Sequence, residues 1–264
     1  MNKIHGRNFL EMSTESRQIN PTINAAGQEA SYDYTDPPLS AAATELFHTG
    51  FRTQEAEGIY TKWAATYESD SFGPLGFSSP ECTALLAARH LKAYQSDNKS
   101  KVQLLDVGCG TGALSGILRE KHDIGTNCTV TFDGCDLTQA MLDVAATRPD
   151  HYQSLQKWDM SHTPWPYKSS NYDMVLCNGV LIYVKANIMN TMIEFHRVLK
   201  VGGKAVLMIR DDDIIKWQPA LDFLADSGAW KLTDESEPIR NFENTFNKEE
   251  VWCRTKVFTK LKEL

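Results

Sequence analysis

The stretch that decides the fold is Leu104-Leu105-Asp106-Val107-Gly108-Cys109-Gly110-Thr111-Gly112-Ala113. An apolar segment runs directly into three alternating glycines, and an amphipathic segment follows them. Glycine tolerates positive φ and lets backbone amides approach a ligand closely, so the pattern predicts a ligand-binding turn between a strand and a helix. A plain turn of this kind rarely needs three glycines in five residues, which makes a purely structural turn the weaker interpretation.

Short apolar runs alternate with amphipathic stretches on the C-terminal side of residue 100. Strands are predicted at 102–107, 129–135, 152–157, 172–177, 204–209 and 251–260. Helices are predicted at 113–121, 138–147 and 186–199, and 217–227 is a further amphipathic segment. Alternation of strands and helices implies right-handed crossovers and a mainly parallel sheet with helices on both faces. The sequence therefore predicts an α/β fold.

The N-terminal part of the chain follows a different pattern. Residues 1–38 are polar and turn-rich, and they are predicted to form a flexible extension. Residues 39–100 are predicted to form a helical lid or cap, and 101–264 the core domain. Within the cap segment, an apolar helix face is formed by Ile59, Tyr60, Trp63, Ala64 and Tyr67. This aromatic face is interpreted either as a mobile lid over the site or as ordinary helix packing, because aromatic stripes often belong to a core.

Composition limits the possible partners. The formal net charge of -7 opposes broad attraction to nucleic acid, which proteins bind mainly through lysine and arginine. The six cysteines form no CxxC pair and no metal-ligand spacing with histidine, so reduced thiols and no metal are expected. Neither a secretory leader nor an apolar run of about 18 residues is visible, so a cytoplasmic protein without membrane contact is expected.

Acidic residues follow three successive predicted strands. Asp106 precedes the glycines, where its carboxylate can meet an ammonium group or order the loop. Asp136 ends the next strand, where its two oxygens can accept both hydroxyls of a ribose, although a helix N-cap explains the position about as well. Asp159 can accept from an exocyclic adenine amino group, and the backbone amide of Met160 can meet a ring nitrogen. Three strand ends thus offer acceptors suited to methionine, ribose and adenine.

A dinucleotide site is the main alternative, because Gly108, Gly110 and Ala113 satisfy the G-x-G-x-x-G/A pattern. Asp106 would crowd a pyrophosphate in such a site. Asp136 also lies well beyond the offset of about 20 residues that is expected for a nicotinamide site. Both positions favour S-adenosylmethionine over a nicotinamide cofactor.

The run from the glycine loop to Asp159 resembles motifs I to III of the class I S-adenosylmethionine-dependent methyltransferases. Asn178-Gly179-Val180-Leu181 and residues 197–203 look like later motifs of that family, so the resemblance covers about residues 58–210. It implies a Rossmann-like class I methyltransferase fold, with a mainly parallel seven-stranded sheet, an antiparallel last strand and helices on both faces. Residues 59–67 and Gly228-Ala229-Trp230 are further similar to the Williams–Beuren syndrome critical-region methyltransferase-like group, although Thr61 and Glu68 replace aspartates of its opening motif.

The resemblance and the residue pattern together predict S-adenosyl-L-methionine as the cofactor and no metal. The residues expected to bind this cofactor are Tyr60, Trp63, Tyr67, Asp106, Gly108, Cys109, Gly110, Gly112, Asp136, Leu137, Asp159, Met160 and Asn178.

The expected activity is methyl transfer to an O, N or S atom of a small-molecule metabolite. The segment after the fourth strand lacks the Pro-rich turn that grips a nucleic-acid base. His196 is interpreted as a packed or partly exposed helix residue and His162 as a loop residue. Residues 210–213, at the end of a predicted strand, are interpreted either as part of the substrate mouth or, in preference, as a solvated turn. No catalytic base is therefore assigned. A non-catalytic S-adenosylmethionine-binding sensor or assembly module remains an alternative, and a dinucleotide-dependent oxidoreductase is less favoured.

Overall fold

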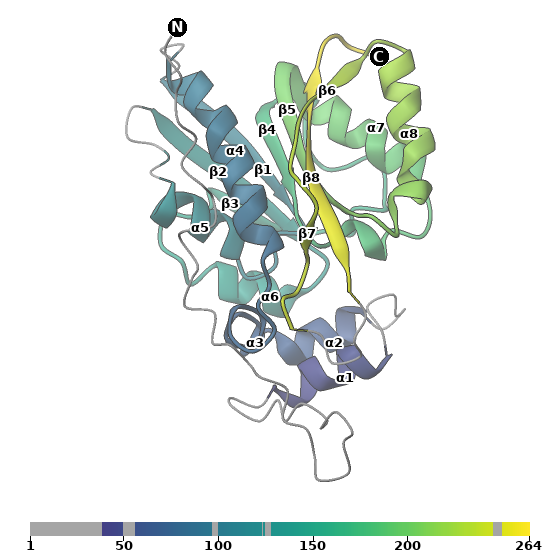
Figure 1. Cartoon of the computed structure of the whole chain (residues 1–264). Coiled ribbons are helices and arrows are strands. Elements are labelled where there is room, and N and C mark those ends of the chain that lie inside the picture. Colours follow the sequence, from purple (N-terminus) through teal and green to yellow (C-terminus); the bar gives the residue numbers. More distant parts are fainter. Residues whose placement is uncertain (1–38, 50–55, 97–99, 123, 125–127, 245–249) are drawn as a thin grey trace, which may run out of the picture. The chain divides into compact units, whose positions relative to one another are not determined.

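An eight-stranded sheet runs through the described part of the chain, with helices packed on both of its faces (Figure 1). The computed structural model describes residues 39–49, 56–96, 100–122, 124, 128–244 and 250–264. These residues belong to one compact unit, 37–264. The predicted extension 1–38 lies outside the described residues.

The strands are β1 Lys101–Val107, β2 Thr129–Asp136, β3 Ser154–Lys157, β4 Tyr172–Cys177, β5 Leu199–Arg210, β6 Trp230–Glu235, β7 Ile239–Arg240 and β8 Trp252–Lys260. The helices are α1 Ala41–Thr49, α2 Ala56–Trp63, α3 Tyr67–Phe72, α4 Ser79–Ser96, α5 Ala113–Lys121, α6 Gln139–Ala145, α7 Ile188–Val198 and α8 Ile214–Asp226, with a short 3-10 helix η2 at Leu181–Tyr183.

The strand order is β3-β2-β1-β4-β5-β8-β6, and the two-residue β7 pairs with β8 beside this path. Strands β1 to β5 are parallel, while β8 pairs antiparallel with both β5 and β6. The predicted mainly parallel sheet with an antiparallel last strand is therefore confirmed, although the sheet has eight strands rather than the expected seven because the short β7 also pairs with β8. The order reverses between β1 and β4, and open α/β sheets bind ligands at the carboxyl ends of the strands beside such a reversal.

Alternation of side chains along the strands supplies two hydrophobic cores. In β1, Val102 and Leu104 pack with α4 and α5, whereas Leu105 and Val107 belong to the cluster that includes α7 and α8. Successive strand residues point to opposite faces, so a strand that is buried on both sides must be apolar throughout. The two helix pairs lie on opposite sides of the sheet in Figure 1.

Helices α1, α2 and α3 form a cap at the carboxyl ends of the parallel strands (Figure 1). The cap has a small core of its own, which contains Leu46, Ile59 and Trp63 together with Phe77 and Phe242. The predicted cap segment 39–100 is thus divided, because α4 packs on the sheet and belongs to the layers of the core domain. The expectation of one helix across 59–67 is wrong, since α2 ends at Trp63 and α3 begins at Tyr67.

Candidate functional site

A cavity of about 560 Å³ lies where β1, β2 and β4 end and the cap helices α2 and α3 begin to cover them. This volume falls within the range of about 300–1,000 Å³ that is typical of small-molecule sites. Every residue predicted to bind the cofactor lines this cavity except Gly112. The topology therefore brings together residues as far apart in the chain as Tyr60 and Asn178, which 118 positions separate.

The glycine loop after β1 forms one wall of the cavity. Gly108 has a φ of +71°, and a Cβ there would lie 2.5 Å from the side chain of Val180, so no other residue fits. Gly110 has a φ of +54°, and a Cβ there would meet no atom within 4 Å. Its open surroundings leave the backbone accessible to a ligand, as the glycine pattern predicts. Gly112 supports the turn from behind the wall rather than lining the cavity.

Asp106, near the end of β1, is buried, and its carboxylate accepts a hydrogen bond of 2.8 Å from the hydroxyl of Tyr152. Burial raises the pKa of Asp106 to about 7, while the Tyr152 bond acts against the rise and the nearby Asp136 adds to it. Asp106 is therefore partly protonated near neutral pH. A bound cation would favour its ionised form.

Asp136, the last residue of β2, connects the glycine loop to the start of α6. Its Oδ2 accepts from the backbone amide of Gly110 at 3.0 Å, and its Oδ1 accepts from that of Thr138 at 2.8 Å. Burial raises the pKa of Asp136, and these two amide bonds oppose the rise. The N-cap residue of α6 is Thr138, so Asp136 is not itself the cap. Each carboxylate oxygen retains a second lone pair that can meet a ligand hydroxyl.

Asp159 and Met160 follow β3 at the next position along the cavity. Oδ1 of Asp159 accepts from the amide and the hydroxyl of Ser161, at 2.8 and 2.7 Å, which fixes the direction of the carboxylate. Met160 is buried, and its carbonyl accepts from the indole of Trp165 at 2.8 Å. The loop is thereby held in one conformation beside the cavity.

Asn178, directly after β4, is oriented by a chain of hydroxyl groups. The Thr83 hydroxyl donates to Oδ1 of Asn178 at 2.8 Å and lies 3.0 Å from the Thr255 hydroxyl. Because a hydroxyl has one proton, Thr83 accepts from Thr255 when it donates to Asn178. This assignment leaves the amide group of Asn178 to act as the hydrogen-bond donor.

The aromatic residues of the cap meet a tyrosine that sequence reasoning did not include. The Tyr60 hydroxyl lies 2.9 Å from that of Tyr183 in η2, and the ring of Tyr67 is 6.1 Å from that of Tyr60. Trp63 is 1% exposed, and its indole N–H donates to Asp70 at 2.7 Å. Trp63 thus belongs to the core of the cap, although its edge reaches the cavity.

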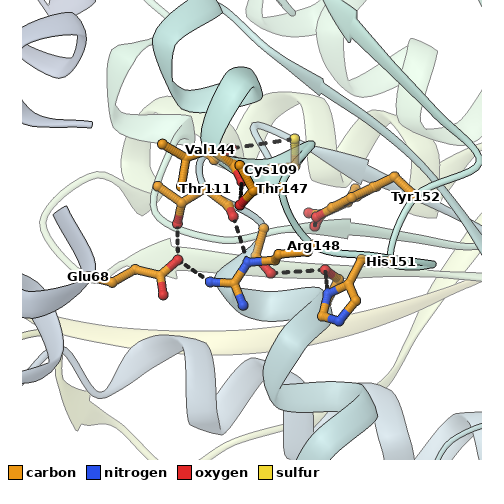
Figure 2. A network of polar contacts seen from close by, with 12 residues as sticks. Glu68, Cys109, Thr111, Val144, Thr147, Arg148, His151 and Tyr152 are labelled. Atoms are coloured by element: carbon orange, nitrogen blue, oxygen red, sulfur yellow. Dashed lines mark hydrogen bonds and ion pairs between the residues drawn. The ribbon is translucent and has the colours of Figure 1, made fainter. Parts of the chain in front are cut away.

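A polar contact attaches α3 to the glycine loop, and Figure 2 shows Glu68 facing both of its partners. Glu68 accepts from the Thr111 hydroxyl and forms an ion pair with Arg148, which follows α6. Nε of Arg148 also donates to the Thr111 carbonyl at 3.0 Å. Glu68, one of the departures from the opening motif, therefore makes a specific contact with the core domain.

The remaining sequence candidates lie as follows. His196 is buried, with Nε2 3.0 Å from the Lys262 carbonyl, and His162 is exposed, so neither lines the cavity. The solvated turn expected at residues 210–213 is wrong in part, because Asp213 is buried and both Arg210 and Asp213 line the cavity.

Three further findings concern metal sites, membrane spans and cysteines. Within the ranges that the structure describes, no group of three or more histidine, cysteine, aspartate or glutamate residues is arranged to hold a metal ion. None of the described helices is long and apolar enough to cross a membrane. The six cysteines are free.

Comparison with known proteins supports this arrangement. Residues 105–207 match the family model described as "Methyltransferase domain". A search among curated proteins finds no significant match.

Solved structures share the fold at low sequence identity. A protein assigned as an S-adenosyl-L-methionine-dependent methyltransferase from Methanococcus maripaludis is 17% identical, with a TM-score of 0.51 over 77% of this chain and 94% of that one. A chain of the Haloferax volcanii complex between the Trm112 methyltransferase activator and a methyltransferase is 15% identical, with a TM-score of 0.52 over 80% of this chain and 99% of that one. The family match, the strand order and the cavity agree that residues 105–207 form a methyltransferase domain.

Proposed function

We propose that this protein transfers the methyl group of S-adenosylmethionine to an O, N or S atom of a small-molecule metabolite. The observation that carries the proposal is the cavity itself, which has acids at the ends of β1, β2 and β3 and a helical cap over them. A covered cavity of this size fits a small acceptor better than a nucleic acid, and the net charge of -7 points the same way.

The donor fits the residues in one orientation. Asp106 binds its ammonium group, Asp136 the ribose hydroxyls, and Asp159 with the Met160 amide the adenine. The open surface at Gly110 lets the backbone approach the ligand. Ser71 supports the same fit, because its buried Oγ lines the cavity and makes no hydrogen bond to a described residue. The remaining contacts are assigned to Tyr60, Trp63, Tyr67, Gly108, Cys109, Leu137 and Asn178, while Gly112 acts only through the conformation of the glycine loop.

The protein contributes orientation and the exclusion of water. The bound donor supplies an electrophilic methyl group on a sulfonium centre. The strand ends hold the donor. The cap covers the space in which the acceptor lies, and the contact of Tyr60 with Tyr183 of η2 closes the cap over it. Holding the reacting atoms in line in a dry site accounts for a large share of such catalysis. No histidine among the described residues lines the cavity, so the acceptor atom must be nucleophilic without a histidine base.

Two finer assignments belong to the same proposal. The similarity of residues 59–67 to the opening of the Williams–Beuren syndrome critical-region methyltransferase-like group supports placing the chain near that group. The six free cysteines support a reducing compartment, and we place the protein in the cytoplasm.

The test has a binding arm and a transfer arm. Calorimetry should show that S-adenosylmethionine and S-adenosylhomocysteine bind and that NAD and NADP do not. Incubation of a metabolite extract with trideuteromethyl-labelled donor should yield a labelled small molecule by mass spectrometry, and Asp136→Ala should yield much less of it when the donor is not saturating. Tight binding of the donor with no labelled product from varied extracts would instead favour a sensor or an assembly module.

A further inference from the structure

The charged side chains that line the cavity are distributed unevenly between its walls. Asp106, Asp136 and Asp159 lie at the ends of β1 to β3, which suits a donor that carries positive charge on sulfur and on its ammonium group. The opposite wall, formed by the end of β5 and the segment after β4, contains the cations Arg210 and Lys185. The acceptor side of the site therefore has the electrostatic character opposite to that of the donor side.

Arg210 is the last residue of β5, and its side chain is 13% exposed. Nε and Nη2 donate to the carboxylate of Asp212 at 2.9 and 2.7 Å. The Asp212 side chain is 52% exposed, so the acid partner faces solvent while the guanidinium lines the cavity. Nη1 makes no hydrogen bond to a described residue, which leaves donors of the planar fork directed elsewhere.

Apart from Asp212, no negative side chain on this wall competes for Arg210 among the described residues. Asp213 is buried, but its carboxylate pairs with Lys216 at 3.0 Å and accepts from the Trp217 indole at 3.2 Å. Its negative charge is therefore compensated locally. Lys185 is an exposed cation at the rim of the cavity.

Tyr183 lies close to Arg210 and adds a neutral hydroxyl. Both residues line the cavity, where the end of β5 contacts η2. Burial raises the pKa of Tyr183, and the positive charge of Arg210 acts in the opposite direction. The hydroxyl stays protonated at neutral pH, so it can donate to an anion. Phe77 and Phe242, which stack with ring centroids 4.9 Å apart, line the same cavity and provide an apolar surface.

We propose that Arg210 and Tyr183 form a subsite for a carboxylate group of the methyl acceptor, whose apolar part packs against the Phe77 and Phe242 rings. The inference rests on the proposed function and specifies its substrate class. A guanidinium fork matches a carboxylate in two parallel hydrogen bonds and holds it in one orientation. Arg210 already pairs with Asp212, and the second cation of this wall, Lys185, is exposed, which suits a singly charged carboxylate better than a phosphate dianion.

The experiment uses the full chain loaded with S-adenosylhomocysteine and measures ligand binding by saturation-transfer NMR and titration. The probes are benzoate and phenylacetate, their amides as neutral isosteres, and phenyl phosphate. The acids should bind at least about tenfold more tightly than the amides, as the loss of a charged hydrogen-bond partner implies. Arg210→Met should remove this preference.

Two further variants make the test independent of damage to the fold. Asp212→Asn removes the exposed carboxylate that competes for Arg210, so the acids should bind several-fold more tightly. Arg254→Met is the matched control, because Arg254 is a partly exposed arginine that pairs with Asp211 outside the cavity. It should leave acid binding unchanged.

The outcomes separate this inference from the proposed function. Failure of S-adenosylhomocysteine to bind the wild-type protein would overturn the proposed function. If S-adenosylhomocysteine binds, equal affinity for acids and amides, no binding of either, or tighter binding of phenyl phosphate would overturn the carboxylate subsite alone. An unchanged preference in Arg210→Met would do the same.

Discussion

Asp136 accepts hydrogen bonds from the backbone amides of Gly110 and Thr138, which are 28 positions apart in the chain. The carboxylate therefore shapes the glycine loop before any ligand arrives. A ligand hydroxyl that meets the same oxygens would find the acceptor already desolvated and oriented, which reduces the entropy lost on binding.

Asp136→Ala should weaken S-adenosylmethionine binding by more than tenfold, because hydrogen bonds to a charged group contribute about 1.5–3 kcal/mol each. The two amides would also lose their acceptor, so the melting temperature should fall slightly. Calorimetry and thermal unfolding measure the two effects, and Asp136→Asn, which keeps one acceptor oxygen, is the control. A lower melting temperature with an unchanged dissociation constant would show that Asp136 only orders the loop.

Asp106 predicts a pH dependence. Burial raises the pKa of Asp106 to about 7, whereas its pKa in the unfolded chain is about 4. Between about pH 4 and pH 7 the folded protein therefore binds a proton on Asp106 that the unfolded chain has lost. The contribution of Asp106 to the free energy of unfolding accordingly falls as the pH rises through this range. A cationic donor favours the carboxylate, so its affinity should increase as pH rises toward 7 and above. Calorimetry below pH 7 in buffers of different ionisation enthalpy should detect proton release on binding. Asp106→Asn should abolish that release, and equal release from both proteins would argue against the assignment.

At the scale of elements, the cap is attached to the core domain by a few polar contacts around the cavity. Glu68 binds Thr111 and Arg148, Glu57 of α2 pairs with Lys157 at 2.7 Å, and Tyr60 meets Tyr183. These contacts are partly exposed, whereas the interior of the cap is apolar. A lid that opens as a unit would break such contacts and keep its own core.

Hydrogen exchange tests this lid. Amides of α2 and α3 should exchange more slowly when S-adenosylhomocysteine is bound, because the ligand adds contacts beneath the cap. Tyr60→Phe, which removes the contact with Tyr183, should lessen the protection. Equal exchange with and without ligand would mean that α2 and α3 form a fixed part of the fold.

Substitution of Trp63 is expected to affect stability more than substitution of the other aromatic residues of the cap. Its side chain is buried and bonded to Asp70, so Trp63→Ala should lower the free energy of unfolding by about 3–5 kcal/mol. A loss of donor affinity in Trp63→Ala would therefore not show whether α2 acts as a mobile lid or is a fixed part of the core. Tyr60→Phe is the sharper test of the lid, since it removes only one hydroxyl.

Glu68→Gln should weaken donor binding by about two- to fivefold, because a partly exposed ion pair contributes up to about 1 kcal/mol. Glutamine keeps an acceptor for the Thr111 hydroxyl and removes the charge that faces Arg148. Glu45→Gln is the matched control, since Glu45 pairs with Lys62 inside the cap. A similar change in both variants would show that cap stability, rather than its attachment to the glycine loop, determines affinity.

The sequence predicted elements best where one face is continuously apolar. Helix α5 has the predicted bounds, because the glycines fix its start and its buried face is unbroken. The helix expected over 59–67 is two helices, yet Tyr60 and Tyr67 still meet because both helices pack on one cluster. Strand β6 was not predicted, since this edge strand has few buried residues.

Site residues divided in a similar way. The acids at the strand ends were visible because each follows an apolar run in the chain. Tyr183 was missed as a site residue, because only the folded arrangement shows that η2 reaches the cavity. A position of Arg210 near the substrate mouth was the less favoured interpretation of residues 210–213, and the structure supports it. No local pattern distinguishes Arg210 from an ordinary surface arginine beside three aspartates.

At the scale of the whole molecule, ligand binding should stabilise the fold by mass action. S-adenosylhomocysteine at a hundred times its dissociation constant contributes about 2.7 kcal/mol. For a chain of this size, each kcal/mol raises the melting temperature by about 2–4 °C, so a rise of roughly 5–10 °C is expected. Asp136→Ala at the same ligand concentration should show a much smaller rise. An equal rise in the variant would place the binding energy elsewhere.

The stacked rings of Phe77 and Phe242 also have a consequence for how the protein is made. One ring belongs to the segment after the cap helices, and the other follows β7, so their isolated bridge closes a loop that contains most of the sheet. Contacts between residues so distant in sequence form late, because the loop entropy must be lost first. During synthesis, the N-terminal cap must wait for the C-terminal strands before its core is complete. The cavity can therefore enclose a ligand only after nearly the whole chain has left the ribosome.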